Sequence, residues 1–419
     1  MKAKQLLAGV AMLAVLGSNA EIRYAGGDIS LLPEYEKAGA KYRTHEGKPI
    51  ADVLEFCREE GMNAMRVRLF VNPDDYKGSD KDPNTCQTLE YILPLCQQIK
   101  NDGYALMLDF HYSDTWADPV KQWTPEAWGD LNDEQLCQKV YDYTKECLHA
   151  LNEAGATPDF IQTGNEISYG MLWGRYGTPK DELKKVNVSG TNYWDRLCSL
   201  LDNAIKACRE ECPDSAVVLH TERVANIKAL NNFYDNMKSH NADYDIIGLS
   251  YYPYFHGDMT KLRIALNNIE HVYPGKRVMI VETGYSYKWE VPGTTQKVDY
   301  EYSDAGQNQF AKDLVATLLD YPSVEGLFWW WMEYNAYGTK LSNWYNAPLF
   351  DSTNGRACSA LKTIASFATG STGVDGIEAE ESAVSPADAE WYDLCGRRVM
   401  DPQESGIYID RVSGRKIAR

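Results

Sequence analysis

Two stretches decide the fold of this chain: Asp159-Phe160-Ile161-Gln162-Thr163-Gly164-Asn165-Glu166-Ile167 and Arg277-Val278-Met279-Ile280-Val281-Glu282-Thr283-Gly284. Each is a short apolar run, of the length of a buried strand, that ends in a carboxylate. A carboxylate at the end of a buried strand costs packing free energy, so its presence indicates chemistry. In an eight-stranded α/β barrel, functional groups lie at the carboxyl ends of the strands. The two stretches therefore predict that Glu166 and Glu282 face each other across such a barrel.

Strand-like runs alternate with helical patterns along most of the chain, and eight strands are enough to close a barrel. The predicted strands are 24–28, 64–70, 105–110, 160–164, 216–220, 246–251, 278–282 and 326–330. The predicted helices are 50–60, 89–100, 134–153, 194–211, 261–272, 307–319 and 357–367. A doubly wound open sheet would also alternate, but it predicts a glycine-rich phosphate loop after the first strand, and Gly26-Gly27-Asp28 is not one. The sequence therefore predicts an α/β protein, a (β/α)8 TIM barrel spanning residues 21–369.

The first 20 residues have the pattern of a signal peptide. Lys2 and Lys4 form a basic start, residues 6–16 are apolar, and Ser18-Asn19-Ala20 is a small-residue cleavage site. The apolar stretch is too short to cross a bilayer, so no transmembrane segment is expected. The pattern predicts an exported protein that resides in the periplasm, at the cell surface or outside the cell.

The composition changes after residue 369. Residues 370–385 are rich in glycine, serine and acidic residues and are predicted to form a linker. Residues 386–419 are predicted to form a short β-rich tail with two small strands, within 391–399 and 406–409, and a basic end. This segment resembles short C-terminal tails of exported Bacteroidetes proteins, some of which serve as secretion or sorting signals. An inert hairpin is the alternative.

The chain is strongly acidic, with a formal net charge of −18. Such a surface repels nucleic acids and anionic membranes, and it also repels a polyuronate, so a neutral substrate is expected. The 11 tryptophans and 28 tyrosines include enough rings to serve as platforms for sugar faces, although most of them are expected in the core. We expect a monomer without a cofactor.

The ten cysteines form an even count that is compatible with disulfides in an oxidising compartment. Several of them lie in amphipathic helical stretches, which instead favours ordinary buried thiols for about half of them or more. Cys208 and Cys212 have helical spacing, but no histidine lies nearby in the sequence. No metal site is therefore expected there.

Polar and aromatic residues converge at the predicted strand ends. Beside the two glutamates, the set comprises Arg66, Arg68, His111, Asn165, Tyr251 and Trp330. Hydrolysis of a glycosidic bond requires one carboxyl that protonates the leaving oxygen and another that attacks the anomeric carbon. An arginine and a tyrosine near the second carboxyl would hold it ionised and aimed. Because both glutamates come from one barrel, we expect their carboxyls about 5 to 5.5 Å apart, which is typical of retaining enzymes.

Several long motifs occur in an order that resembles glycoside hydrolase family 53. They are Gly26-Gly27-Asp28-Ile29-Ser30, Gly61 to Pro73 with Arg66-Val67-Arg68, Leu108-Asp109-Phe110-His111-Tyr112-Ser113-Asp114-Thr115-Trp116, Gly164-Asn165-Glu166-Ile167 and Ile247 to Pro253. The resemblance extends from about residue 24 to about residue 367. It implies a (β/α)8 fold, retaining chemistry and endo-hydrolysis of β-1,4-galactan, the neutral side chains of pectin.

The resemblance also implies roles for individual residues. Glu166 would be the acid/base and Glu282 the nucleophile. Their support and the sugar-binding surface would be formed by Arg68, His111, Asp114, Trp116, Asn165, Tyr251 and Trp330.

The chain departs from the family pattern at two places, Ser168-Tyr169 and Trp331-Met332, where flanking sugar subsites would be built. Product length is therefore not implied by the resemblance. Some relatives bind calcium after strand seven, but residues 285–304 lack a tight run of oxygen ligands, so we expect no metal. Two alternatives remain open: a related endo-β-1,4-mannanase with the same two glutamates, and a non-catalytic barrel that binds galactan for an uptake system. The intact glutamates argue against the second alternative.

Overall fold

A computed structural model describes residues 22–189, 192–339 and 347–371, together with the backbone of four short strands between 391 and 418. The predicted signal peptide, 1–20, lies outside the described residues. So does the predicted linker, 370–385, except for its first two residues.

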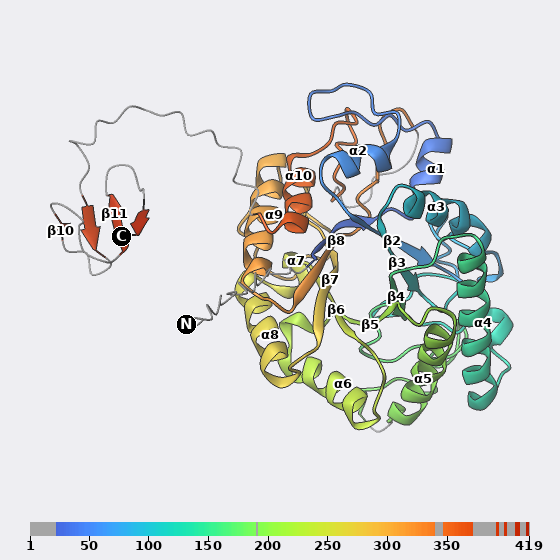
Figure 1. Cartoon of the computed structure of the whole chain (residues 1–419). Helices are drawn as coiled ribbons and strands as arrows, with labels where there is room; N and C mark the ends of the chain where they lie inside the picture. The colour runs from blue at the N-terminus through green and yellow to red at the C-terminus, as the bar shows by residue number, and fades with distance from the viewer. Residues whose placement is uncertain are drawn as a thin grey trace, which may run out of the picture. The chain divides into compact units, whose positions relative to one another are not determined.

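The described chain forms a closed barrel of eight parallel strands, in which each strand pairs with the next and β8 pairs with β1. Figure 1 shows the strands at the centre and the helices around them. The strands are β1 Tyr24–Asp28, β2 Ala64–Leu69, β3 Ala105–Phe110, β4 Phe160–Thr163, β5 Ala216–Thr221, β6 Ile246–Tyr251, β7 Arg277–Thr283 and β8 Val324–Trp329. The prediction of a (β/α)8 barrel is confirmed.

The α-helices connect the strands and cover the outside of the barrel (Figure 1). They are α1 Leu32–Lys37, α2 Val53–Glu59, α3 Leu89–Asn101, α4 Asp133–Glu153, α5 Trp194–Glu211, α6 Ile227–Ser239, α7 Pro253–His256, α8 Met259–Val272, α9 Asp304–Leu319 and α10 Ser359–Ala365. The sequence prediction did not name α6, although Leu230, Phe233, Tyr234 and Met237 have helical spacing and are buried.

Side-chain caps begin most of the longer helices. Asp52 accepts from a backbone N–H of α2, Thr88 from one of α3, and Ser303 from one of α9. At α4, Asn132 and Gln135 form a reciprocal capping box. These caps satisfy backbone donors that would otherwise lack partners at the helix ends, so the turns before the helices are fixed by local sequence.

The barrel interior has an apolar layer beneath a polar layer. The apolar layer receives buried side chains from strands all round the barrel: Ala64, Met107, Phe160, Ala216, Val218, Ile246, Met279, Val281 and Phe328. On four of these strands, the residue two positions after the apolar one is polar and buried. These residues are Arg66, Asp109, Gln162 and His220. Strand alternation places both sets on the inner face, so the polar layer lies at the carboxyl ends of the strands.

An extra residue in β7 aims Glu282 into this polar layer. Leu249 of β6 pairs with Ile280, but the next residue, Ser250, pairs with Glu282, so Val281 is additional. Such a bulge reverses the alternation that follows it. Val281 and Glu282 both face inward as a result.

Residues of the C-terminal segment form a separate antiparallel sheet, and the chain divides into a unit of residues 1–373 and a unit of 374–419. The strand order is β10-β9-β11-β12. The strands are β9 Trp391–Asp393, β10 Arg398–Val399, β11 Ile407–Asp410 and β12 Lys416–Ala418. We predicted two strands, and the structure has four. The first predicted run contains both β9 and β10, and the basic end forms β12.

Within the described residues, no helix is both long and apolar enough to cross a bilayer. The nine cysteines of that part of the chain are all free, and most of them are buried.

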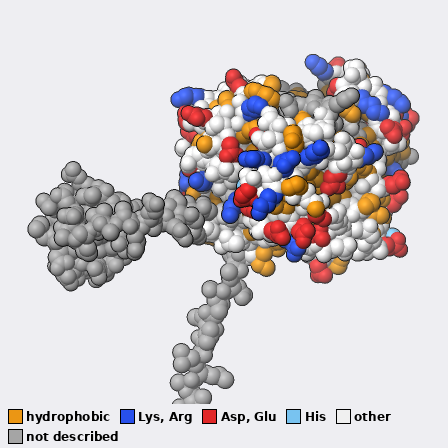
Figure 2. Space-filling view, turned by 90° about the horizontal axis from the view of Figure 1, so that it is seen from above, with side chains coloured by type: hydrophobic (Ala, Val, Ile, Leu, Met, Phe, Trp, Pro, Cys, Tyr) orange, Lys and Arg blue, Asp and Glu red, His pale blue; other side chains and the backbone are white. Residues whose placement is uncertain are grey.

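On the face drawn in Figure 2, Lys and Arg side chains form a band that acidic side chains border, and hydrophobic side chains are scattered among them.

Candidate active site

Glu282 ends β7, and two donors hold its carboxylate. The Arg66 guanidinium donates from Nη2 to Oε1 at 2.9 Å, and the Tyr252 hydroxyl donates to Oε2 at 3.1 Å. Burial raises the pKa of Glu282 to about 7, and the Arg66 cation opposes this rise. A carboxyl in this environment can ionise near neutral pH, as a nucleophile must.

Arg66 is a fully buried cation that joins several strands. Its Nη1 donates to Asp28 Oδ2 at 3.2 Å, and its Nη2 lies 2.8 Å from Asp109 Oδ2 and 3.0 Å from Asn165 Oδ1. A guanidinium keeps its charge when buried and offers donors in a rigid fork. Arg66 therefore fixes Glu282 against the polar layer and compensates the negative charge there.

Glu166 follows β4 in a different environment. Its φ of +48° lies in the left-handed region, which non-glycine residues adopt at a cost of roughly 1 to 3 kcal/mol and mainly at functional sites. Its Oε1 accepts from the Ser250 hydroxyl at 2.6 Å. Burial raises the pKa of Glu166 well above its usual range, and the carboxyls of Glu282 and Glu222 raise it further. This environment favours the protonated form of the carboxyl, which a general acid requires.

His220 and Ser250 connect Glu166 to the barrel interior. His220 Nε2 lies 2.8 Å from Ser250 Oγ, and the Glu166 backbone N–H donates to His220 Nδ1 at 3.3 Å. Burial lowers the pKa of His220 well below its usual range, and the Arg66 cation lowers it further. This histidine is therefore neutral.

The structure places Tyr251 and Arg68 away from the Glu282 carboxylate. Tyr251 faces the helices, donates to Gly257 O at 2.9 Å and packs near Phe310, whereas Tyr252 is the tyrosine that contacts Glu282. Ser250 points inward, and alternation then places Tyr251 outward and Tyr252 inward.

Arg68 does not contact Glu282 either; Arg66 does. Arg68 donates to Asp28 Oδ1 at 2.8 Å, and its guanidinium carbon lies 5.0 Å from the Trp116 ring centre and 4.7 Å from that of Trp330. Arg66 lies two residues before Arg68 on the same face of β2, and its guanidinium is the one that donates to the Glu282 carboxylate.

Trp116 and Trp330 form an aromatic wall together with Arg68. Their ring centres are 5.9 Å apart in an edge-to-face arrangement, and Trp116 Nε1 donates to Asp82 at 2.8 Å. Trp330 is partly exposed just after β8. Trp331 and Met332 are buried, so the structure does not place them on a sugar-binding surface.

The other predicted residues, His111, Asn165 and Asp114, hydrogen-bond to groups around the two glutamates and not to the glutamates themselves. His111 accepts the Ala117 N–H at Nδ1, and its Nε2 lies 3.0 Å from Asp109. Asn165 Oδ1 accepts from Arg66, and its Nδ2 donates to Ala117 O at 2.9 Å. Asp114 accepts two backbone N–H groups, from Asn72 and Glu126, and thereby fixes the loop after β3.

Six further side chains of this site were not among the predicted site residues: Asp28, Asp109, Gln162, His220, Ser250 and Tyr252. Arg66 was noted in the sequence but not selected. One signal in the sequence could have identified several of them. In the predicted strands, an apolar residue is repeatedly followed two positions later by a polar one, as in Ala64-x-Arg66 and Val218-x-His220.

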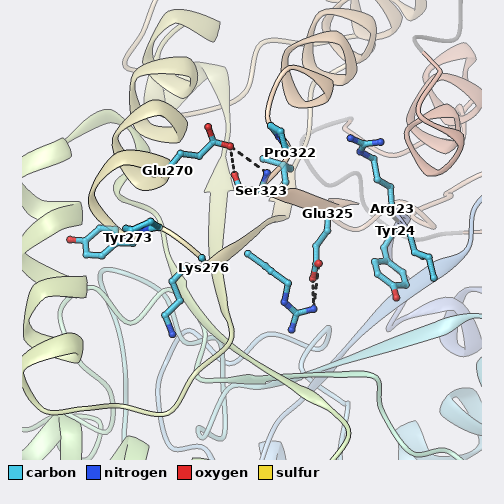
Figure 3. Close-up of a pocket in the computed structure, with 13 residues that line it drawn as sticks. Arg23, Tyr24, Glu270, Tyr273, Lys276, Pro322, Ser323 and Glu325 are labelled. Carbon is cyan, nitrogen blue, oxygen red and sulfur yellow. Dashed lines mark hydrogen bonds and ion pairs between the residues drawn. The ribbon is translucent and has the colours of Figure 1, made fainter. Parts of the chain in front are cut away.

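A cavity of about 1010 Å³ lies away from these carboxyls, at the amino ends of β1, β7 and β8. Figure 3 shows Glu270 directed toward Ser323, and Arg277 pairs with Glu325 at 3.0 Å. Glu270, Arg277 and Glu325 thus each have a partner within the lining of this cavity. Within the described residues, no three His, Cys, Asp or Glu side chains are grouped to hold a metal ion.

Two carboxyls in contrasting environments, at the carboxyl ends of β4 and β7 of a (β/α)8 barrel, define the class of this protein as a glycoside hydrolase. Residues 24–364 match the sequence model of Glycosyl hydrolase family 53. The chain belongs to that family.

Three similar proteins support the assignment. The arabinogalactan endo-β-1,4-galactanase of Cellvibrio japonicus is 32% identical over 374 residues, which cover 84% of this chain and 93% of that protein. The arabinogalactan endo-β-1,4-galactanase of Humicola insolens is 31% identical over 325 residues, which cover 74% of this chain and 89% of the relative. The solved GH53 catalytic domain of Ignisphaera aggregans is 30% identical with a TM-score of 0.71, covering 84% of this chain and 97% of that domain.

Proposed function

We propose that this protein is a retaining endo-hydrolase of β-1,4-galactosidic bonds, with Glu282 as the nucleophile and Glu166 as the acid/base. The observation that carries the proposal is the contrast between the two carboxyls. Arg66 and Tyr252 donate to Glu282, whereas Ser250 donates to Glu166. The substrate is inferred from the family and from the names of the relatives in Cellvibrio japonicus and Humicola insolens.

The reaction proceeds in two steps. Glu166 protonates the leaving glycosidic oxygen while the Glu282 carboxylate attacks the anomeric carbon and forms a galactosyl ester. Glu166, now ionised, takes a proton from water, and the water oxygen cleaves that ester with net retention of configuration. Asn165 Nδ2 donates one hydrogen to Ala117 O, and its second hydrogen is suited to a sugar hydroxyl beside Glu282.

The acidic chain favours neutral galactan over polygalacturonate, because like charges repel. Export is inferred from the basic and apolar pattern of residues 1–20. Galactan side chains of pectin, which occur outside the cell, would then be the accessible substrate.

Incubation with debranched galactan, mannan and polygalacturonate tests this proposal. We expect new reducing ends from galactan alone and a rapid fall in viscosity, which is characteristic of internal cleavage. Preferential release from mannan would instead favour the endo-β-1,4-mannanase alternative, and binding of galactan without cleavage would favour the non-catalytic one. Proton NMR of the first product should show the β-anomer.

A further inference from the structure

We infer that Ser250 is a positioning residue, which occupies Oε1 of Glu166 throughout the reaction so that Oε2 alone gives and takes the catalytic proton. The inference rests on the proposed function of Glu166 and concerns how that function is achieved. It assigns His220 a matching task, namely to fix the direction in which the Ser250 hydroxyl points.

The direction of the hydrogen bonds follows from His220 Nδ1. The Glu166 backbone N–H donates to this nitrogen, and the Gln162 side-chain nitrogen, which can only donate, lies 3.1 Å from it. Asn165 Oδ1 also lies 3.0 Å from Nδ1, but this oxygen already accepts from Arg66 Nη2 and Gln162 Nε2. We therefore assign Nδ1 as an acceptor that carries no hydrogen. Because a buried neutral imidazole has one N–H, that hydrogen is on Nε2.

The Nε2–H of His220 then donates to Ser250 Oγ at 2.8 Å. With its oxygen accepting from His220, the Ser250 hydroxyl turns its own hydrogen to Glu166 Oε1 at 2.6 Å. The chain of donors runs one way, from His220 through Ser250 to Glu166. Both His220 and Ser250 are fully buried, so solvent does not compete for these bonds.

An oxygen that accepts a short hydrogen bond is a poor place for a proton of its own. In the protonated form of Glu166 the hydrogen therefore resides on Oε2. The bond from Ser250 persists when Glu166 ionises, since a carbonyl oxygen and a carboxylate oxygen both accept. Glu166 can change from acid to base without rotating its carboxyl.

The backbone places Ser250 for this task. The bulge in β7 sets Ser250 directly opposite Glu282 in the pairing of β6 and β7. One serine backbone thus lies beside the nucleophile while its side chain holds the acid/base. Ser250 also limits how far burial and the Glu282 charge raise the pKa of Glu166, because its hydrogen bond is stronger to the ionised form.

The test is the pH profile of kcat/KM for galactan hydrolysis by the full chain and by its Ser250→Ala variant. We expect kcat to fall roughly 10- to 100-fold, the effect of losing a hydrogen bond to a charged group. The alkaline limb, which requires protonated Glu166, should move to higher pH, because the ionised form loses a donor. Ser250→Cys keeps the size but is a weak donor, so it should shift the limb in the same direction.

Ser215→Ala is the matched control, since Ser215 is also buried but donates to Pro158 O away from the carboxyls. It should leave kcat and both limbs unchanged. A folded Ser250→Ala protein with an unmoved alkaline limb overturns the inference, whether or not its kcat falls. If Ser250→Ala does not fold, an unmoved limb in Ser250→Cys overturns it equally. A wild-type protein that leaves galactan intact would instead overturn the proposed function.

Discussion

At the residue scale, Glu166 and Glu282 differ in which donors reach them, and this difference predicts how their variants respond to an external nucleophile. Glu282→Ala should lower kcat by several orders of magnitude and still bind oligosaccharide, because only the proposed nucleophile is removed. Azide should restore turnover on an activated aryl galactoside and give a product of inverted configuration. Product NMR decides the outcome: if Glu166→Ala gave the inverted azide instead, the two roles would be exchanged.

Arg66 and Arg68 differ in their charge partners, although they share one face of β2. If Glu282 is the nucleophile, as proposed, catalysis requires its ionised form, so kcat/KM should rise with pH through the pKa of Glu282, near 7. Lysine cannot reproduce the fork that reaches Asp28, Asp109 and Glu282. Arg66→Lys should therefore raise the pKa of Glu282 and move the rising limb of the pH profile of kcat/KM to higher pH. It should also lower kcat/KM by about 100-fold.

Arg68→Lys is the control for this experiment. Arg68 stacks against Trp116 and Trp330 and does not touch Glu282, so its loss should weaken substrate binding and leave the rising limb in place. An equal shift of the limb in both variants would show that Arg66 does not set the ionisation of Glu282.

Glu333 is a fully buried carboxyl behind the aromatic wall, and its Oε1 accepts the Leu31 N–H at 2.8 Å. Burial raises its pKa from 4.5 to about 8, with a further contribution from Asp28. As pH rises between these values, the unfolded chain releases this proton first, so the folded state loses stability through the window. Glu333→Gln should remove that loss. Its thermal midpoint should exceed that of the wild type at about pH 8, and the difference should be small at about pH 5; a constant difference would contradict the assignment.

At the element scale, the eight strands and most helices could be predicted because apolar runs, glycines and prolines mark them locally. The candidate site was predicted less completely. Whether Tyr251 or Tyr252 faces inward depends on strand phase, and β6 is buried on both faces, so its apolar pattern does not reveal that phase. Likewise, the aim of Glu282 depends on the bulge at Val281, which is set by pairing with β6 and β8 and not by the β7 sequence.

Close strand contact at Gly26 provides a test of the barrel geometry. A Cβ at this position would lie 1.7 Å from Ala64 O, a backbone atom of the paired strand β2. Gly26→Ala should therefore lower the free energy of unfolding by about 3 kcal/mol or more. Gly103→Ala, in a turn where a Cβ meets nothing within 4 Å but φ is +82°, should cost only about 1 to 2 kcal/mol. Urea denaturation measures both values, and equal losses would contradict the close approach of β1 and β2 at Gly26.

At the scale of the whole molecule, the barrel unit contains every side chain of the candidate site, and the C-terminal strands form a sheet of their own. The sequence placed the end of the barrel at residue 369, whereas the division by contacts falls after residue 373. The described backbone makes hydrogen bonds to the barrel unit just past residue 369, where Gly370 N–H donates to Phe367 O and Ser371 N–H to Ser366 O. A shortened chain should keep both of these bonds.

We therefore predict that a chain ending at Gly373 keeps its specific activity on soluble galactan and its thermal midpoint within error. The physical reason is that Val374–Arg419 form a compact unit of their own, so we expect the barrel core to stay intact without them. If the tail directs the protein to the cell surface, as its resemblance to sorting tails implies, fractionation of the producing cells should show loss of surface delivery alone. An internal control is a second truncation, ending before α10 at Cys358, which removes the buried Leu361 and Ile364 and should unfold the barrel. A chain ending at Gly373 that unfolds or loses activity would show that the tail packs against the barrel and contributes to its stability.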